Sequence, residues 1–574
     1  MVPHIKKLLF YMMPYRWHFV WASICLAATN YFMVQIPEEI GNSIDGIAKG
    51  TSLSSIINIA WMGATVMLVR SMSRIYFFNP ARYVEYEIRK ELFSKLLALS
   101  SSFYASFNRG DIVSRASNDI MWVRIMVGFG GLQFVNLIFA LVLTGWKMFS
   151  ISPALSIATL IPIGIGFLIV NLAISRLHPM MRKNQEELAT ISDHVLESFQ
   201  SVSTIQGFQA EKSFEDRFEK QNAEWFDTGL KLAFWQSIFT PLLALSSGGA
   251  IFALIYVGAP LVQQGDVTVG QLAAFIALIA SLLPFMRSIG WMLSVWHRGF
   301  AAWERILELL NTPLDRPEGN NPVEVPDVRQ NPISIQNLSF AYPEAPEKLI
   351  LNDISAHIPP GSMVGVFGRT GSGKTTLLRI LARIYNPDEK MVFVGEKDIR
   401  TFDIAAWRKE LAVVPQIPFL FSESIFSNIA LQDEGVEGRV QEAIRLASLD
   451  QDITSFEQGL DTIVGERGIM LSGGQRQRVA LARGLFHEAS LILLDDVLSA
   501  VDHENESKLV STLYQLSQTG VTCFIVSNRV SAFRYAQNIL VLEEGKLIAQ
   551  GSHEELIGQE GLYKETYLAQ KEGQ

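Results

Sequence analysis

The chain has 574 residues, of which 49% are hydrophobic and 18% are charged, and its formal net charge at pH 7 is −9. A chain of this length is too long for one ordinary core and predicts two or more domains, and its acidic balance argues against a nucleic-acid partner. Two cysteines, Cys25 and Cys523, are too few for a disulfide framework or a thiolate metal site.

Long apolar runs with few charges fill the chain up to about residue 300. A membrane-spanning helix needs roughly 20 apolar residues. Six runs meet this requirement, and they cover residues 17–36, 54–79, 128–149, 152–174, 236–263 and 268–296. The sequence therefore predicts a helical transmembrane domain over residues 1–305, in a multi-pass protein of the inner (plasma) membrane. The first run is long and has no small-residue cleavage site, so a signal peptide is not expected.

The distribution of positive charge predicts the orientation of these spans. Lysine and arginine cluster before the first span, after the second and after the fourth, whereas the short loops between carry acidic residues such as Glu38 and Asp266. Both termini are therefore expected in the cytoplasm. The long segments 80–127 and 175–235 have apolar residues three and four apart, which is typical of amphipathic helices. We expect them to extend the spans as helical stalks, with a turn near Gly207.

A change in composition marks the second half of the chain. Residues 306–330 are rich in proline, asparagine and acidic residues and predict a linker, and residues 331–574 alternate short apolar strands with polar helices. This pattern predicts an α/β domain. Within it, the apolar run Met363–Phe367 leads into Gly368-x-x-x-x-Gly373-Lys374-Thr375 and then a leucine-rich helix, which is the phosphate-binding P-loop in its strand–loop–helix context.

The P-loop predicts ATP and Mg²⁺ as ligands. Its glycines let backbone N–H groups converge on phosphate oxygens, and the helix N-terminus adds a positive end. Lys374 is expected to reach the β- and γ-phosphates, and the Thr375 hydroxyl to ligate Mg²⁺. The expected nucleotide-binding residues of this loop are Gly368, Arg369, Thr370, Gly371, Ser372, Gly373, Lys374, Thr375 and Thr376.

Two further segments have the chemistry of a nucleotide site. Residues 491–494 predict a buried strand that ends in Asp495, placed to hold Mg²⁺ through water. The next residue, Asp496, stands where a carboxylate would activate water, although it could also cap the following turn. Ser472, Gly473, Gly474 and Gln475 open an amphipathic helix, which is a second anion-binding helix start. One domain does not need two such starts for one nucleotide, so two domains face to face are expected, each presenting this turn to the other's ATP.

These motifs resemble those of half-size ATP-binding cassette (ABC) exporters of the multidrug-resistance-like type, and the resemblance covers nearly the whole chain. The matching motifs follow the family's order: Tyr342 in "LSFAYP", the P-loop 368–375, Gln416 in "VVPQIPFLFSESIFSNIAL", "GERG" at 465–468, the "LSGGQ" signature at 471–475, Walker B at 491–495 and "SAVD" at 499–502. The segments 107–120 and 206–218 are similar to regions of the family's intracellular coupling loops.

The resemblance implies a type I exporter fold with six transmembrane helices and a P-loop NTPase cassette. It also implies that Tyr342 stacks on adenine and that Gln416 serves both as a Mg²⁺ ligand, with Thr375 and Asp495, and as a residue of the catalytic site. Two positions depart from the family: Asp496 replaces a glutamate that acts as general base, and Asn528 replaces a histidine.

The two departures predict a weak site. General-base catalysis contributes about 10²–10⁴ in rate, and a carboxylate displaced by roughly an ångström can lose about 10²-fold. Asn528 can donate a hydrogen bond but cannot carry a positive charge. Because the signature is intact and serves the partner's ATP, we expect a heterodimer with a second half-transporter that keeps both catalytic groups and carries most of the hydrolysis.

The resemblance implies ATP-driven export of hydrophobic or amphipathic small molecules. A lipid flippase and an ATP-binding regulatory half with little hydrolysis remain alternatives. A soluble ABC ATPase is excluded by the spans, and a peptide exporter with its own protease is disfavoured because about 16 residues precede the first span. Arg70 and Arg74, late in the second span, are expected near the inner interface, where snorkelling explains them.

Overall fold

The computed structural model describes residues 2–47, 53–315, 322–431, 435–465, 468, 470–500 and 503–572. The chain forms two units. The first comprises Met1–Leu97 and Arg109–Thr312, and the second comprises Ala98–Asn108 and Pro313–Gln574. The short helix α4 (Ser101–Ser106) thus belongs to the second unit, although its sequence lies inside the expected transmembrane domain.

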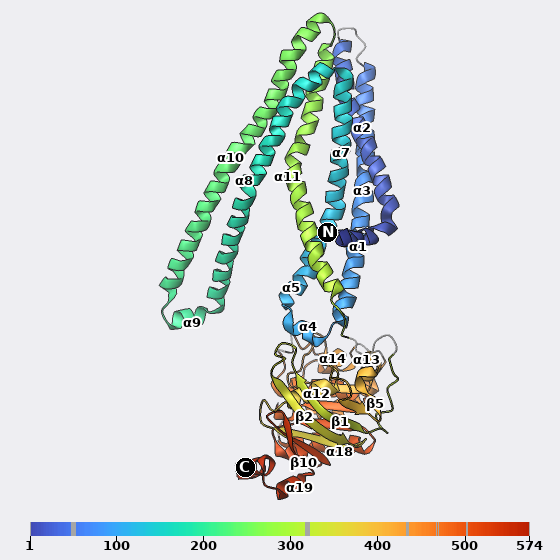
Figure 1. Cartoon of the computed structure of the whole chain (residues 1–574), viewed down its shortest axis with the longest axis vertical. Coiled ribbons are helices and arrows are strands. Elements are labelled where there is room, and N and C mark those ends of the chain that lie inside the picture. Colours follow the sequence, from blue (N-terminus) through green and yellow to red (C-terminus); the bar gives the residue numbers. More distant parts are fainter. Residues whose placement is uncertain are drawn as a thin grey trace. The chain divides into compact units, whose positions relative to one another are not determined.

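Long helices build the first unit (Figure 1). They are α2 (Arg16–Ile47), α3 (Leu53–Ala98), α7 (Gly131–Ile151), α8 (Pro153–Gln200), α10 (Glu211–Gln264) and α11 (Val269–Asn311), and α1 (Val2–Met12) precedes them. Each expected span falls inside one of these longer helices, apart from at most three residues at the start of the span. Within the described residues, five helical stretches are long and apolar enough to cross a membrane, and the sixth expected span lies in α11, whose apolar stretch there is Val269–Leu282.

Local signals set the ends of these helices. The hydroxyl of Ser152 caps α8 by accepting a hydrogen bond from the Leu155 amide, and Pro153 follows at the first helical position. Thr268 and Gln271 form a capping box at the start of α11. The helix before it, α10, ends at Gly265 in a left-handed conformation with φ +84°. Helices α10 and α11 are therefore joined by a tight turn.

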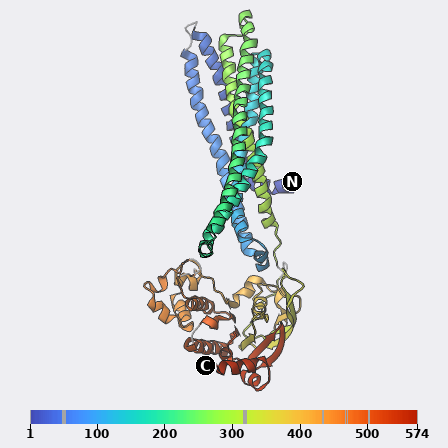
Figure 2. The same ribbon diagram turned by 90° about the vertical axis from the view of Figure 1, so that its left-hand side faces the viewer.

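Residues 175–235, one of the two segments expected to form amphipathic stalks, belong mostly to a pair of long helices. Helices α8 and α10 have 48 and 54 residues, lie side by side and are joined through the short helix α9 (Val202–Gly207) (Figures 1 and 2). The turn thus lies where the sequence predicted it. The stacked rings of His194 and Phe214, whose centroids are 5.6 Å apart, join the two helices near this turn.

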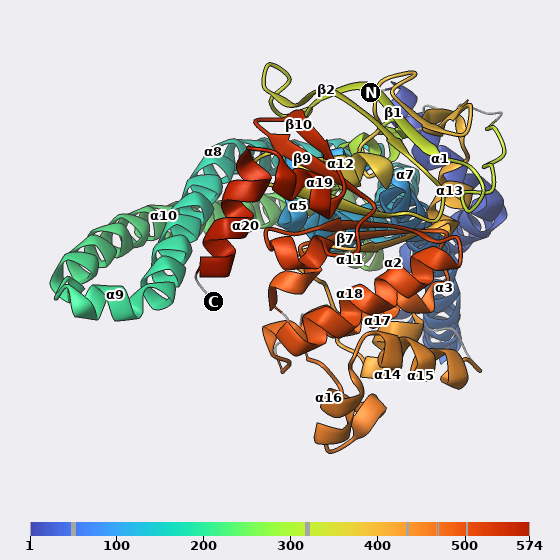
Figure 3. The ribbon, with the colours of Figure 1, turned by 90° about the horizontal axis from the view of Figure 1, so that it is seen from below.

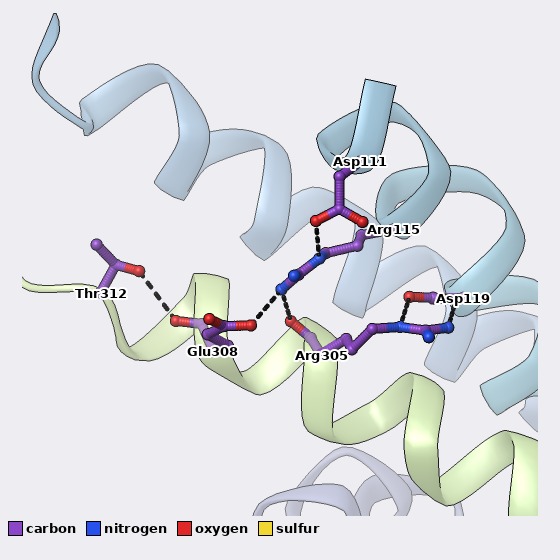
Figure 4. Close-up of polar contacts among 6 residues, drawn as sticks. All are labelled: Asp111, Arg115, Asp119, Arg305, Glu308 and Thr312. Carbon is purple, nitrogen blue, oxygen red and sulfur yellow. Dashed lines mark hydrogen bonds and ion pairs between the residues drawn. The ribbon is translucent and has the colours of Figure 1, made fainter. Parts of the chain in front are cut away.

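A polar network fixes the C-terminal half of α11 against the segment that precedes α7 (Figure 4). This segment consists of α5 (Arg109–Ser114), a π-helical turn (Arg115–Asp119), α6 (Ile120–Ile125) and a second π-helical turn (Met126–Gly130). Arg115 donates to Glu308 at 2.6 Å and to the carbonyl of Arg305 at 2.8 Å, and Arg305 donates two hydrogen bonds to Asp119.

Helix α11 continues to Asn311, six residues into the range that the sequence assigns to the linker. The physical reason is tertiary packing. Ile306, Leu307 and Leu310 on this last stretch are buried, and the ion pairs of Figure 4 hold its polar face. The proline- and asparagine-rich composition begins to dominate only after the helix has ended.

Two sheets form the core of the second unit, which Figure 3 shows from below. The first is antiparallel, with the order β2-β1-β4-β5; its strands are β1 (Ile333–Ala341), β2 (Leu349–Ile358), β4 (Val392–Val394) and β5 (Lys397–Asp398). The second has the order β10-β9-β3-β8-β7-β6; its strands are β3 (Met363–Gly368), β6 (Leu411–Val414), β7 (Leu491–Asp495), β8 (Thr522–Val526), β9 (Asn538–Glu543) and β10 (Lys546–Gly551).

In the second sheet, all neighbours from β9 to β6 run parallel, and β10 is antiparallel to β9. The strands β3, β7 and β8 are buried along their whole length, which explains why they are continuous apolar runs in the sequence. Successive residues of β8 enter opposite halves of the core: Cys523 and Ile525 belong to one cluster, and Phe524 belongs to the other. The predicted α/β domain is thereby confirmed.

Helices complete the second unit. They are α12 (Lys374–Leu381), α13 (Ile404–Lys409), α14 (Ile425–Ala430), α15 (Glu437–Leu446), α16 (Asp450–Ser455), α17 (Gly473–Phe486), α18 (His503–Gln518), α19 (His553–Gly558) and α20 (Leu562–Glu572). Figures 2 and 3 show that α14, α15 and α16 gather on one side of this unit, away from β1 and β2.

Candidate nucleotide site

The strand order brings the predicted site residues together at one edge of the second sheet. Because β3, β8, β7 and β6 are parallel neighbours, their carboxyl ends share an edge, where α/β proteins bind ligands. The segments that follow these four strands line one cavity of about 350 Å³. The predicted residues that line it are Thr370, Gly371, Ser372, Gly373, Lys374, Thr375, Thr376, Gln416, Asp495, Asp496 and Asn528.

The P-loop leaves β3 through a backbone that only glycine accommodates. A Cβ on Gly368 would lie 2.2 Å from the carbonyl oxygen of Leu542 on the neighbouring strand β9. Gly373, at the N-cap of α12, has φ +96°. The Lys374 ammonium donates to the carbonyl oxygens of Gly368 and Arg369, at 2.7 and 2.9 Å. Burial lowers the pKa of Lys374, and the charges of Asp496 and Asp495 oppose this shift.

Oxygen atoms suited to a hard cation lie side by side in this cavity. The Thr375 hydroxyl donates to Oδ1 of Asp495 at 3.0 Å, and burial raises the pKa of Asp495. Among the described residues, no cluster of three or more His, Cys, Asp or Glu side chains could hold a metal alone. Mg²⁺ usually completes its shell with water and substrate phosphates, and the buried Ser372 hydroxyl has no hydrogen-bond partner among the described residues. The residues present therefore fit ATP with Mg²⁺.

Asp496 is held in an unusual conformation at the tip of β7. Its φ is +49°, in the left-handed region, and its amide donates to the carbonyl of Val526 at the end of β8. Oδ2 of Asp496 accepts a hydrogen bond of 3.1 Å from Nε2 of Gln416, the residue expected after β6. Burial raises the pKa of Asp496, and the hydrogen bond from Gln416 opposes this rise. The backbone thus presents the carboxylate to the cavity.

The loop that carries Asn528 is fixed by residues that sequence reasoning missed. Asn528 is exposed and lines the cavity, and its carbonyl accepts a hydrogen bond of 2.9 Å from Gln570 on α20. The next residue, Arg529, pairs with the buried Glu506 of α18 at 2.7 Å. Lys348 also lines the cavity without having been predicted. No local motif marks these residues, because each acts through a tertiary contact.

Tyr342 lies beside the first turn of α12. Its hydroxyl and the Thr376 hydroxyl are 2.9 Å apart, and its ring makes edge contacts with Phe340 and Tyr385 at centroid distances of 5.4 and 5.1 Å. Tyr342 is not among the described residues that line the 350 Å³ cavity. It is therefore adjacent to the P-loop helix through Thr376.

The signature residues lie outside this cavity. Ser472 and Gln475 form a capping box at the start of α17, and Gln475 also donates to Asp452 at 3.1 Å. Gly473 and Gly474 follow the cap as the first residues of the helix. Within the described residues, the structure thus brings the P-loop, Gln416, the two aspartates and Asn528 together, and leaves the signature apart. Residues 466, 467, 501 and 502 of two further predicted motifs lie outside the described residues.

Comparisons with known proteins agree with this architecture. Residues 19–284 match the family described as ABC transporter transmembrane region, and residues 351–499 match the family described as ABC transporter. The chain is 31% identical to the probable multidrug resistance ABC transporter ATP-binding/permease protein YheI of Bacillus subtilis, covering 99% of this chain and 97% of that protein. It is also 31% identical to the multidrug resistance-like ATP-binding protein MdlA of Escherichia coli, covering 93% and 91%.

The fold is shared with a solved structure of a bacterial Atm1-family ABC exporter with ATP bound. The TM-score is 0.80, with 23% identity over 97% of this chain and 98% of that chain. The chain therefore belongs to the ABC transporter family, with the type I exporter fold of a multi-pass membrane protein whose ATPase is coupled to transport.

Proposed function

We propose that this chain is one half of a heterodimeric exporter of hydrophobic or amphipathic small molecules, and that its own nucleotide site hydrolyses ATP slowly. Its relatives are named for multidrug resistance, which supports this cargo class. The observation that carries the asymmetry is the pair Asp496 and Asn528, which both line the cavity that contains the P-loop.

The proposed roles follow from the contacts of each side chain. Lys374 and the P-loop amides would bind the phosphates, and Thr375 and Asp495 would hold Mg²⁺, which would supply charge neutralisation for the transferred phosphoryl group. Asp496 orients the attacking water from its position beside Gln416. Its side chain is one methylene shorter than glutamate, so the carboxylate stays roughly an ångström back and loses about 10²-fold in rate.

The intact signature supports the pairing with a different chain. Ser472 to Gln475 do not line this chain's own cavity, so we assign them to a partner's nucleotide. A partner with glutamate and histidine at the two altered positions would then carry most of the turnover. We further propose that both termini face the cytoplasm of the cell, because lysine and arginine flank that side of the spans.

The experiment is to express the chain alone and together with the product of its adjacent reading frame. ATP turnover is measured in nanodiscs, and ATP-dependent uptake of a dye is measured in inverted vesicles. We expect substrate-stimulated turnover and uptake only for the pair, and loss of ATP binding at this chain's site in Lys374→Ala. Vigorous drug-stimulated turnover by this chain alone would contradict the heterodimer, and ATP binding without uptake by the pair would favour a regulatory role.

The two departures are expected to act together. Asn528→His adds a group that can carry charge, but Asp496 still positions the water poorly, so this single change is expected not to restore rapid hydrolysis. If Asn528→His alone gave full turnover at this site, the account based on two defects would be wrong.

A further inference from the structure

The first unit contains a polar cavity that the nucleotide chemistry does not use. It has a volume of about 80 Å³ and lies among α2, α3, α7 and α11, the group of helices visible in Figure 1. Arg70 and Arg74 of α3 line it, and no Asp or Glu is among the described residues that do so. The cavity therefore combines two positive charges with no countercharge from the described chain.

These two arginines differ from those further along α3. Arg70 and Arg74 are one helical turn apart on the same face, and neither makes an ion pair or a side-chain hydrogen bond with another described residue. By contrast, Arg89 and Arg124 both pair with Glu85, at 2.8 and 3.4 Å. Both side chains are exposed in this chain as well as lining the cavity, and like charges one turn apart on a helix repel each other.

The depth of the pair along α3 places it toward one membrane interface. At 1.5 Å per residue, Arg70 and Arg74 lie about 26 and 32 Å from the start of α3 at Leu53, near the far edge of a hydrocarbon core of about 30 Å. From such a position a long side chain can reach the headgroups, so depth alone does not assign the pair a function. Snorkelling, which the sequence favours, accounts for contact with the nearer headgroups but not for a shared cavity with amide side chains of other helices.

Amide groups complete the set of donors. Nδ2 of Asn30 donates to Oδ1 of Asn136 at 2.8 Å, which leaves the Asn136 NH₂ as a free donor among the described residues. Gln133, one turn earlier on α7, also lines the cavity without a side-chain hydrogen bond to a described residue. Two guanidinium groups and two amides that converge in this way suit a carboxylate, sulfonate or phosphate.

The other walls of the cavity are apolar. Leu26 and Met33 of α2, Leu132 of α7 and Phe285 of α11 line it beside the charged face. A volume of about 80 Å³ holds a few water molecules or one small headgroup, and not a whole amphiphile. The lining thus suits a molecule whose charged end enters the cavity while its apolar part packs against these walls.

We propose that this cavity binds the anionic headgroup of an amphipathic molecule, and that anionic amphiphiles are the cargo class of this half-transporter. The inference rests on the proposed export function, which it makes more specific. Arg70 and Arg74 bind the charge, Gln133 and Asn136 orient the headgroup, and the apolar walls bind the adjoining chain. The anion has two possible sources, a free amphiphile or the headgroup of an anionic membrane lipid.

The test uses the full chain in phosphatidylcholine nanodiscs and two fluorescent probes that differ only in charge, dansylaminoundecanoic acid and its methyl ester. We expect the wild-type chain to bind the acid more tightly than the ester. Arg70→Gln combined with Arg74→Gln should weaken binding of the acid by about 10- to 100-fold and leave the ester unchanged. Arg70→Lys with Arg74→Lys should keep most of the preference for the acid over the ester. The matched control is Arg176→Gln, at an exposed position on α8.

Equal loss of acid and ester, or unchanged binding of the acid in the glutamine variant, would overturn the proposal. ATP binding at the second unit verifies that each variant is folded. If the glutamine variant does not fold, the lysine variant still decides the test. Replacing part of the phosphatidylcholine by phosphatidylglycerol separates the two sources: displacement of the acid identifies a lipid headgroup, and retention identifies a free amphiphile. Because binding of the probes needs no ATP, a negative result in this binding test can be distinguished from a loss of ATP-dependent uptake, which tests the proposed function.

Discussion

Gly373 and Gly371 of the P-loop offer a matched pair of substitutions. Both have left-handed backbones, with φ of +96° and +85°, so alanine at either position costs about 1–2 kcal/mol of strain. At Gly373 the added Cβ would also lie 2.5 Å from Cδ2 of Leu351 and 3.0 Å from the carbonyl oxygen of Ile350, whereas at Gly371 nothing lies within 4 Å. Leu351 is fully buried, so Gly373→Ala should lower the free energy of unfolding by about 1–3 kcal/mol more than Gly371→Ala.

Cys523 provides the assay for this difference. It is fully buried in β8, and burial raises the pKa of its thiol to about 12, so a thiol reagent reaches it only when the second unit opens. With Cys25 replaced by serine, the full chain is labelled in nanodiscs without nucleotide. A free energy of unfolding that is lower by a further 1–3 kcal/mol predicts labelling about 5- to 150-fold faster in Gly373→Ala than in Gly371→Ala. Equal rates would refute the steric argument.

Three other outcomes are expected. Burial raises the pKa of Asp496, and this carboxylate must be ionised to act as a base. As the pH is lowered, turnover at this site should therefore begin to decline at a higher pH than it would with an ordinary aspartate. Gln416→Ala removes the hydrogen bond that opposes the rise in pKa, so it should move the midpoint of the pH profile still higher. Asp496→Glu should raise single-turnover ADP formation at this site by about 10²-fold. Arg305→Met leaves the buried Asp119 without its charged partner and should lower the stability of the first unit by about 1–3 kcal/mol in thermal unfolding. The control is Arg182→Met, which removes an exposed ion pair and should change that stability by under about 0.5 kcal/mol.

The parts of the site that the sequence predicts are those encoded by local motifs. The P-loop and Asp495 each follow a short apolar strand, and parallel strands place their carboxyl ends at one edge. The cavity that joins Lys374, Asp495 and Gln416 follows from that rule once the strands are known. The turn near Gly207 was predicted in the same way, because the apolar period of the two stalk helices is interrupted there.

What the sequence does not predict depends on contacts between distant residues. Gln570 fixes the carbonyl of Asn528 from a helix 42 residues further along the chain. The extension of α11 past residue 305 depends on buried Ile306 and on the pairing of Glu308 with Arg115, whereas composition alone indicates a linker. Depth along one helix places Arg70 near an interface, but only the packing of four helices puts it in a cavity with amide groups.

The position of the two altered residues separates nucleotide binding from turnover. Asp496 and Asn528 follow β7 and β8, strands that are buried along their whole length, so substitutions at these tips leave the sheet and the P-loop in place. Among the groups that would hold phosphate and Mg²⁺, Lys374 donates to the carbonyl of Gly368 at 2.7 Å and Thr375 donates to Asp495 at 3.0 Å. A site altered only at the first two positions should therefore bind ATP normally and differ in the rate of the chemical step. In the proposed heterodimer, such a site would hold the two nucleotide domains together through bound ATP while the partner's site sets the rate of transport, so slow hydrolysis at this site would still leave it a role.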